Sequence, residues 1–322
     1  MHADDRAWLA AAARLAERGR PLSLPNPAVG ALLVKDGRVL ARGWTQPGGR
    51  PHAEAETLNR AGEAAAEATL YVTLEPCAHK SHRGPSCADL LADARVKRVV
   101  YGLLDPDPRT AGRGVARLTA AGVAAEQLAC DKTEASLAGY LNRQKRGRPY
   151  ITLKLATSLD GQIALPDGQS QWITNGAARA HVHAQRARQD AIVVGRGTWD
   201  ADRPRLDVRL PGLENRSPRR MVLTRGPVPD GATALHAPEE VFALEEEQYL
   251  YIEGGAEAAA AFLRADLVDR VDLYRAPLLI GAGKTALGDF GVAELARAHG
   301  QWRLADRRQL GSDVFEAYER IR

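Results

Sequence analysis

The sequence is poor in cysteine and in aromatic residues. Its 322 residues include three cysteines, and Phe, Trp and Tyr together make up 5% of the chain. Three cysteines are too few, and odd in number, for a scaffold held together by disulfides. We therefore expect reduced thiols and a cytoplasmic protein. Few aromatic rings also argue against a surface on which the bases of single-stranded nucleic acid would stack.

Long apolar runs and dense basic clusters are missing as well. No apolar stretch approaches the length that a bilayer crossing needs, so we expect no membrane association. The N-terminal MHADDRAWLAAAARLAERG begins with acidic residues and predicts an amphipathic helix rather than a secretory signal. The net charge is +4, and the basic run RQKRGRP at 143–149 is typical of a solvated linker rather than a nucleic-acid patch. These features favour a small-molecule substrate over nucleic acid.

Strand-like and helix-like patterns alternate along the first half of the chain. This alternation predicts a layered α/β fold. We expect strands at 29–34, 38–43, 69–76 and 96–104, and helices at 53–67, 87–94 and 112–122.

A second pattern begins after GRPY at 147–150 and shows no repeat of the first. We therefore expect two domains, residues 1–147 and 148–322. In the second domain we expect strands at 150–156, 190–195, 220–224, 249–252, 271–276, 302–308 and 313–320.

Two cysteines and a histidine form a candidate metal site in the first half. Cys77 and Cys87 lie in LEPCAHKSHRGPSC, and upstream PHAEAE supplies His52 with Glu54 two residues later. Thiolate and imidazole suit zinc, and three protein ligands leave a fourth position for a water. We expect His52 at the start of a helix with Glu54 in its first turn, and a second helical turn opening at Pro76-Cys77. A carboxylate near the metal can shuttle protons.

The order His-x-Glu followed by Pro-Cys and a second Cys is typical of zinc-dependent nucleobase deaminases. Nine residues separate Cys77 from Cys87, whereas the usual signature has two. A turn at Gly84-Pro85 would still return the second thiol. The alternatives are core cysteines without metal, and a closed structural zinc site with His79 or His82 as fourth ligand. Cys130 is expected to be a small core residue.

Ordered motifs along nearly the whole chain resemble one family, the bifunctional pyrimidine deaminase/reductases of riboflavin biosynthesis. The motifs of the first half are NPAVGALLVKDG, GGRPHAEAETLNRAG, TLYVTLEPCAHKSHRGPSC and LLDPDPRTAGRG. Those of the second half are RPYITLKLATSLDGQIA, GQSQWITN, DAIVVGRGTWDADRPRL and YIEGGAEAAAAFL.

The resemblance implies a cytidine-deaminase-like three-layer domain followed by a dihydrofolate-reductase-like domain. The first would use zinc to deaminate a phosphorylated diaminopyrimidine, and the second would use NADPH to reduce its ribosyl group to ribityl. It also implies a homo-oligomer, a dimer or larger. Rival interpretations are an RNA deaminase with an RNA-binding second half, and a zinc protein without catalysis.

The resemblance assigns roles to individual residues. Zinc falls on His52, Cys77 and Cys87, the proton shuttle on Glu54, and Asn26 lies near the substrate ring. The cofactor would contact Ala156, Trp172, Thr174, Thr198, Asp202, Thr224, Gly255, Ala256, Glu257, Ala258, Ala259, Ala260 and Ala261. The substrate of the reductase would contact Lys154, Ser170, Arg186, Leu206, Arg209 and Glu253.

This sequence departs from the family pattern in three places. The segment between Cys77 and Cys87 is one residue longer than usual. Arg203 stands where Asp or Asn is common, which would alter contacts to cofactor or substrate phosphate. The stretch 225–248 is short, which affects the alignment of Thr224.

Overall fold

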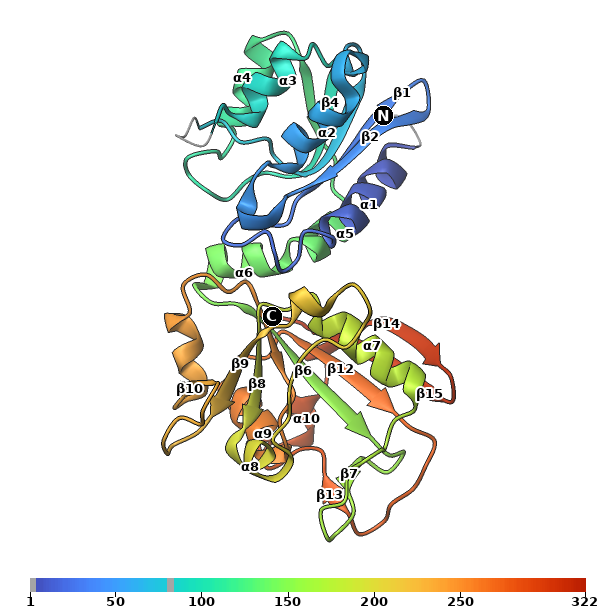
Figure 1. Ribbon diagram of the computed structural model, residues 1–322, viewed down its shortest axis with the longest axis vertical. Helices are drawn as coiled ribbons and strands as arrows, with labels where there is room; N and C mark the ends of the chain where they lie inside the picture. The colour runs from blue at the N-terminus through green and yellow to red at the C-terminus, as the bar shows by residue number, and fades with distance from the viewer. Residues whose placement is uncertain (1–3, 80–83) are drawn as a thin grey trace. The chain divides into compact units, whose positions relative to one another are not determined.

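The computed structural model describes residues 4–79 and 84–322. Within it the chain divides into two units, residues 1–147 and 148–322, each with its own hydrophobic core (Figure 1). None of the helices in the described part combines the length and the apolarity that a membrane crossing requires.

The first unit is built on a sheet with strand order β2-β1-β3-β4-β5. Strand β1 pairs antiparallel with β2 and β3, whereas β3, β4 and β5 run parallel. Parallel strands need helical crossovers, which cover the faces of the sheet. The strands are β1 (Gly30–Lys35), β2 (Arg38–Trp44), β3 (Thr69–Leu74), β4 (Arg98–Leu103) and β5 (Ala124–Gln127).

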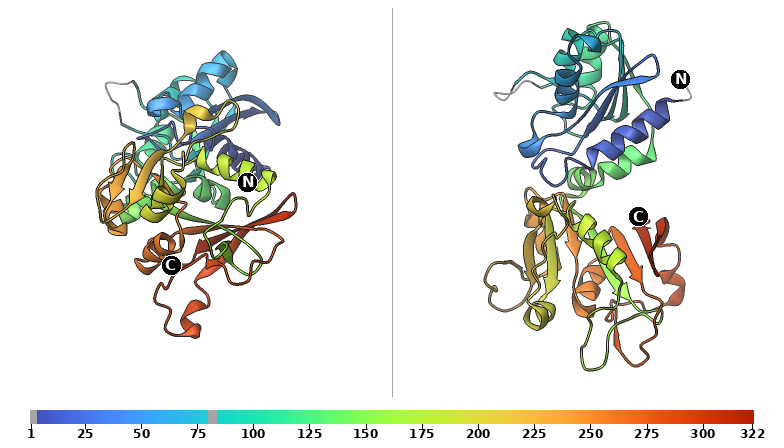
Figure 2. Two further views of the ribbon diagram at one scale, coloured as in Figure 1. Left: turned by 60° about the horizontal axis from the view of Figure 1, so that its bottom comes forward. Right: turned by 45° about the vertical axis from the view of Figure 1, so that its right-hand side comes forward.

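Helices cover both faces of this sheet and make three layers (Figure 2). Side chains alternate along β1, so Leu33 joins the core under α2, α3 and α4, and Leu32 joins the core under α1. The helices are α1 (Asp5–Ala16), α2 (Ala53–Ala61), α3 (Cys87–Asp93), α4 (Arg113–Ala120), α5 (Asp131–Ser136) and α6 (Ala138–Arg146), with 3-10 turns η1 (Pro47–Gly49) and η2 (Gly62–Ala65).

Two local predictions for the first unit were wrong. The helix expected at 53–67 ends at Ala61, because Gly62 takes a positive φ of 54° and η2 follows. The basic run at 143–149 is not a solvated linker throughout. Its first part closes α6, Gly147 caps that helix in the left-handed region, and Arg148 is buried.

The second unit contains an eight-stranded sheet in the order β10-β9-β8-β11-β6-β12-β15-β14. The pairs from β10 to β12 are parallel, and β15 and β14 add an antiparallel edge. The strands are β6 (Tyr150–Thr157), β8 (Ala191–Gly195), β9 (Arg219–Leu223), β10 (Thr233–Leu235), β11 (Tyr249–Ile252), β12 (Arg270–Arg275), β14 (Trp302–Leu310) and β15 (Asp313–Arg320), with a separate pair β7 (Gln162–Ala164) and β13 (Lys284–Thr285).

Helices α7 and α9 lie on opposite faces of this sheet (Figures 1 and 2). Phe262 of α9 packs against Ile151 and Leu250, whereas Val182 of α7 packs against Tyr274 and Phe315. The helices are α7 (Gly176–Arg186), α8 (Arg196–Asp202), α9 (Ala256–Arg264) and α10 (Leu295–Ala298), with 3-10 turns η3 (Glu214–Arg216) and η4 (Pro238–Ala243).

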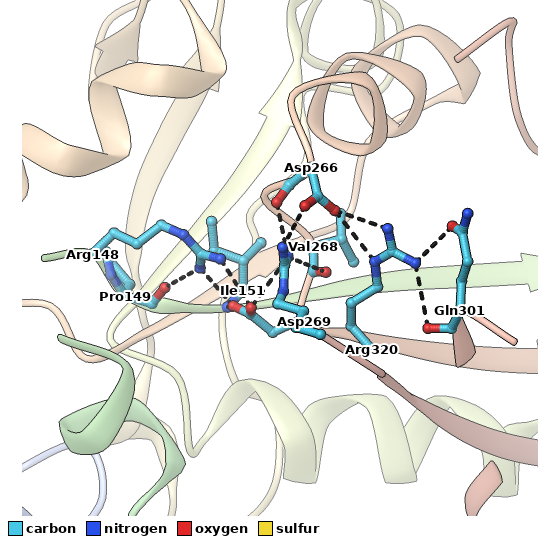
Figure 3. A network of polar contacts seen from close by, with 9 residues as sticks. Arg148, Pro149, Ile151, Asp266, Val268, Asp269, Gln301 and Arg320 are labelled. Carbon is cyan, nitrogen blue, oxygen red and sulfur yellow. Dashed lines mark hydrogen bonds and ion pairs between the residues drawn. The ribbon is translucent and has the colours of Figure 1, made fainter. Parts of the chain in front are cut away.

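Buried charges fix the start of β6 in the second unit (Figure 3). The Arg148 guanidinium donates to both carboxylate oxygens of Asp269, at 2.6 and 2.9 Å, and the backbone N–H of Ile151 donates to the same carboxylate at 2.9 Å. Nearby, Asp266 accepts from Arg320 at the surface. The first pair is buried and the second is half exposed.

This contrast predicts unequal effects of two matched substitutions. Asp269→Asn removes the carboxylate charge that compensates the buried Arg148 guanidinium, so the free energy of opening β6 should fall by about 3–5 kcal/mol. Asp266→Asn should cost only about 0–1 kcal/mol, because the Asp266 side chain is more than half exposed and solvent screens its ion pairs. Native-state hydrogen exchange of the β6 amides measures both. Equal effects would contradict the assigned role of the buried pair.

Candidate active sites

Three elements of the first unit bring His52, Cys77 and Cys87 together. His52 is the N-cap residue of α2 with extended backbone, Cys77 follows the end of β3, and Cys87 is the first residue of α3. Their ligand atoms all lie within 4.8 Å of one another. Both cysteines are buried. The prediction that the long intervening segment still returns the second thiol is therefore confirmed.

The geometry of this group suits zinc. His52 Nδ1 lies 3.3 Å from Cys87 Sγ and 3.6 Å from Cys77 Sγ. Ordinary zinc–sulfur and zinc–nitrogen bonds at a tetrahedral angle would place sulfur and nitrogen about 3.6 Å apart. Within residues 4–79 and 84–322, no fourth histidine, cysteine or carboxylate joins the three. Such a donor set leaves a tetrahedral ion one open position.

A helix N-terminus faces the thiols, but it is not the one expected. No helical turn opens at Pro76-Cys77, so that prediction was wrong. Instead α3 begins at Cys87, where Ser86 caps the helix, and the Cys87 N–H donates to Cys77 Sγ at 3.3 Å. A free N–H at a helix start favours the thiolate form that metal binding requires.

The electrostatics of the three groups are coupled. A hydrogen bond from the Cys87 thiol lowers the pKa of Cys77 to about 4, and the same bond, with burial, raises the pKa of Cys87. Burial alone would lower the pKa of His52, but the hydrogen bond to Cys77 and the charge of Glu54 raise it. Of the two thiols, Cys77 is therefore the one that the protein favours more as a thiolate.

Glu54 lies in the first turn of α2, as predicted, and is 4% exposed. Burial raises the pKa of its carboxyl to about 7, while the His52 charge lowers it. A hydrogen bond with Cys87 is among its interactions. Glu54 therefore lies beside the donor set as an ionisable group shielded from water.

A cavity of about 300 Å³ opens onto this group. Asn26, predicted to lie near the substrate ring, lines it, and its amide contacts His52 Nε2 at 3.1 Å and Gly49 O at 2.9 Å. Several lining residues were not predicted from the sequence. The acidic DPDP segment that follows a predicted strand could have indicated two of them, Asp105 and Asp107. The missed residues are Arg50, Glu75, Asp105, Asp107, Arg109, Tyr140 and Gln144, and His79, considered above only as a metal ligand, also lines the cavity.

The structure places two of the three remaining candidates, His79 and Cys130. His79 lies 3.5 Å from Thr110 Oγ1 and is not in the donor group, so it does not close the site. His82 lies outside the described residues. Cys130 packs partly buried against the core that α1 covers, which confirms its expected place.

The second unit has a larger cavity, about 540 Å³, where β6, β8 and β11 end. Carboxyl ends of parallel strands are the usual ligand sites of open α/β sheets. Gly254 and Gly255 line it between β11 and α9, and a Cβ at Gly254 would lie 2.6 Å from the Ala258 Cβ. Glycine here lets α9 start directly against the strand, so the start of this helix borders the cavity, and a helix start favours an anionic group.

Most residues assigned to the reductase site lie on this one cavity. They are Ala156, Trp172, Thr174, Thr198, Asp202 and Gly255 from the cofactor set, and Lys154, Ser170, Arg186, Leu206, Arg209 and Glu253 from the substrate set. Residues of the cavity that sequence reasoning missed include Arg179, His183 and Arg205. These residues come from separate segments of the chain, so their spacing in the sequence does not predict that they share one cavity.

The remaining assigned residues are not on the cavity. Thr224 is buried after β9, where its hydroxyl accepts the Gly226 N–H. Ala256, Glu257, Ala258, Ala259, Ala260 and Ala261 form the first turns of α9, and three of these alanines are buried against the sheet. Their side chains therefore position the helix rather than line the cavity.

Glu253 is the electrostatic centre of the second cavity. It receives two hydrogen bonds from Arg186, at 2.6 and 2.9 Å, and lies 3.6 Å from Lys154 Nζ. Burial would raise the pKa of Glu253, but the charges of Arg186 and Lys154 outweigh it and lower this pKa to about 2. The Lys154 side chain is therefore largely buried beside Glu253 and does not extend into solvent. Arg203 also lines the cavity, from a left-handed position that ends α8.

Comparisons with known proteins find matches to both units. Residues 2–103 match the family described as cytidine and deoxycytidylate deaminase zinc-binding region, and residues 149–315 match the RibD C-terminal domain. Riboflavin biosynthesis protein RibD of Mycobacterium tuberculosis is 41% identical over 311 residues, covering 90% of each chain. That of Escherichia coli is 37% identical over 360 residues, covering 96% of this chain and 98% of that protein.

Solved structures give the same result over the full length. RibD of Acinetobacter baumannii superposes with a TM-score of 0.86 at 34% identity, covering 99% of each chain. A diaminohydroxyphosphoribosylaminopyrimidine deaminase/5-amino-6-(5-phosphoribosylamino)uracil reductase of Thermotoga maritima gives 0.87 at 27%, covering 98% of this chain and 99% of that one.

These findings confirm the predicted pair of folds, a cytidine-deaminase-like domain followed by a dihydrofolate-reductase-like domain. They also place the chain among enzymes, against the interpretation as a zinc protein without catalysis. The chain belongs to the RibD family of riboflavin biosynthesis proteins, bifunctional enzymes that join a zinc-dependent deaminase domain to an NADPH-dependent reductase domain.

Proposed function

We propose that residues 1–147 hydrolytically deaminate 2,5-diamino-6-(ribosylamino)-4(3H)-pyrimidinone 5'-phosphate. Residues 148–322 then reduce the ribosyl side chain of the product to ribityl with NADPH. The observation that carries the proposal is the donor set of one half-buried imidazole and two buried thiols beside the buried carboxylate of Glu54. A structural zinc site has no use for such a carboxylate.

His52, Cys77 and Cys87 would hold the zinc. Zinc at such a site supplies Lewis-acid activation of a water nucleophile. Glu54 takes a proton from the attacking water and delivers it to the departing amino group, which leaves as ammonia. Its burial keeps bulk water away from this transfer. The Asn26 amide contacts His52 Nε2 and also borders the cavity, where it can hydrogen-bond the pyrimidine ring.

The residues of the second cavity would bind cofactor and substrate together. NADPH supplies the hydride. The start of α9 and the hydroxyls of Thr174 and Thr198 offer donors to its phosphates. Arg186, paired with Glu253, and Arg209 place cationic groups toward a phosphorylated sugar. Their task is to hold the opened sugar against the nicotinamide.

The proposal also covers the location of the protein, its class of substrate and its assembly. The protein acts in the cytoplasm, and its three cysteines are free thiols. It acts on a small phosphorylated pyrimidine without nucleic acid, which two cavities of about 300 and 540 Å³ suit better than an extended basic surface. It assembles as a homo-oligomer, which rests on the family resemblance alone.

The proposal is tested by mixing the zinc-loaded protein with the diaminopyrimidine substrate and NADPH. We expect release of one ammonia per substrate together with loss of nicotinamide absorbance. Omitting the substrate should abolish both signals, and omitting NADPH should abolish only the second. Absence of ammonia release from zinc-loaded protein would refute the deaminase role of this chain.

A further inference from the structure

Glu75 is a buried carboxylate for which the proposed reaction has no direct use. It follows the last residue of β3 and is 2% exposed. Both of its oxygens are occupied by backbone donors. Oε2 accepts the N–H groups of Asp105 at 3.3 Å and Gly112 at 3.0 Å, and Oε1 accepts those of Gly114 at 3.0 Å and Val115 at 3.2 Å.

These four donors belong to two different features. Gly114 and Val115 lie in the first turn of α4, whose N–H groups have no partner within the helix. An anionic group is favoured at that end of a helix. Asp105 and Gly112 bound the segment 105–112, which runs from the end of β4 to the start of α4. One side chain therefore holds both ends of this segment.

The same contacts tie the segment to the metal donor loop. A Cβ on Gly114 would lie only 2.0 Å from the Pro76 carbonyl oxygen, so α4 packs directly on the backbone that leads to Cys77. Glu75 is two residues before Cys77. The position of segment 105–112 relative to the zinc donors is thus set by one short, buried stretch of chain.

Segment 105–112 forms one wall of the deaminase cavity. Asp105, Asp107 and Arg109 line this cavity together with Glu54. The side chain of Asp105 is fixed from its other side, because Tyr140 Oη donates to Asp105 Oδ1 at 2.6 Å. Backbone and side chain of this wall residue are therefore held separately, by Glu75 and by Tyr140.

We infer that Glu75 is a positioning residue of the deaminase, which sets the wall of Asp105 and Asp107 against the zinc donors. It cannot itself contact the substrate without giving up a backbone donor, because both of its oxygens are engaged. This inference rests on the proposed deaminase function. It predicts that loss of Glu75 weakens substrate binding more than it slows the chemical step.

The test is Glu75→Gln in the full-length, zinc-loaded protein. Glutamine has one acceptor oxygen, so two of the four buried N–H groups would face an amide NH₂ and the wall would shift. We expect KM for deamination to rise about tenfold or more, with kcat within about threefold. Zinc content and NADPH-dependent reduction of the deaminated substrate should stay at wild-type values. Glu63→Gln, at an exposed position of η2, is the matched control.

Each outcome decides the inference. An unchanged KM in a zinc-loaded Glu75→Gln protein overturns it, even if the melting temperature falls, because that result describes a purely structural residue. If Glu75→Gln loses zinc, Tyr140→Phe is used, since it releases the Asp105 side chain and leaves Glu75 in place. A raised KM in that variant supports the positioned wall, and an unchanged KM overturns it. Wild-type protein that releases no ammonia would refute the proposed function itself.

Discussion

Glu54→Gln is expected to lower kcat for deamination by about 10²–10⁴-fold, the range that a positioned acid–base group contributes. Glutamine keeps the size of the side chain and can still hydrogen-bond, but it cannot accept and return a proton. Because Glu54 is buried beside the donor set and is not part of it, zinc binding should persist. The measurements are ammonia release under saturating substrate and zinc content of the same sample.

The matched control is Glu56→Gln, two residues further along α2. Glu56 forms an ion pair with Arg60 on the outer side of this helix, so its loss should leave deamination within about twofold. Reductase turnover should be unchanged in both variants. Near-normal deamination in a zinc-loaded Glu54→Gln protein would remove Glu54 from the mechanism and leave proton transfer to another group of the cavity.

Cys77→Ser is expected to eliminate both zinc binding and deamination while NADPH-dependent reduction persists. A serine hydroxyl does not ionise near neutral pH and is a poor zinc ligand, whereas Cys77 is favoured as a thiolate by the Cys87 N–H and thiol. Zinc should fall from about one per chain to near zero. Metal analysis after gel filtration, followed by separate assays of the two activities, measures this.

The reductase should survive because its cavity is formed by residues 154–255 over a core of its own. Cys130→Ser is the control, since this third thiol packs under α1 and is not in the donor group. It should retain zinc and both activities. If Cys77→Ser abolished reduction as well, in a protein that remained folded, the two sites would depend on each other and the picture of separate units would fail.

The sequence predicted the arrangement of the metal site because its ligands sit at element boundaries that local rules recognise. His52 occupies the N-cap position of α2, Glu54 lies in its first turn, and Cys77 lies three residues after the end of β3. These are short-range features of helix starts and strand ends. The main strands were predictable for a similar reason, because buried parallel strands read as continuous apolar runs.

Spacing alone could not decide the return of Cys87. Nine residues lie between the thiols, and a segment of that length has many possible end-to-end distances. The two thiols are brought together by the hydrogen bond from the Cys87 N–H to Cys77 Sγ and by the start of α3. Both depend on the packing of α3 against the sheet. The helical turn expected at Cys77 is absent for the same reason. The helix begins at Cys87 instead, where Ala88 and Leu91 pack into the hydrophobic core.

The short pair β7 and β13 was likewise hidden, because its two strands are about 120 residues apart and too short to show a period. The sequence by itself predicted a donor group of an imidazole and two thiols with a carboxylate beside it, and a change of pattern near residue 147, where the structure divides into two units. Only the tertiary structure decided which walls surround them. Glu75, Asp105 and Tyr140 meet through contacts between segments distant in sequence, and no local pattern encodes such a meeting. Chain connectivity fixes the order of the elements, but burial and hydrogen bonding between elements fix their distances.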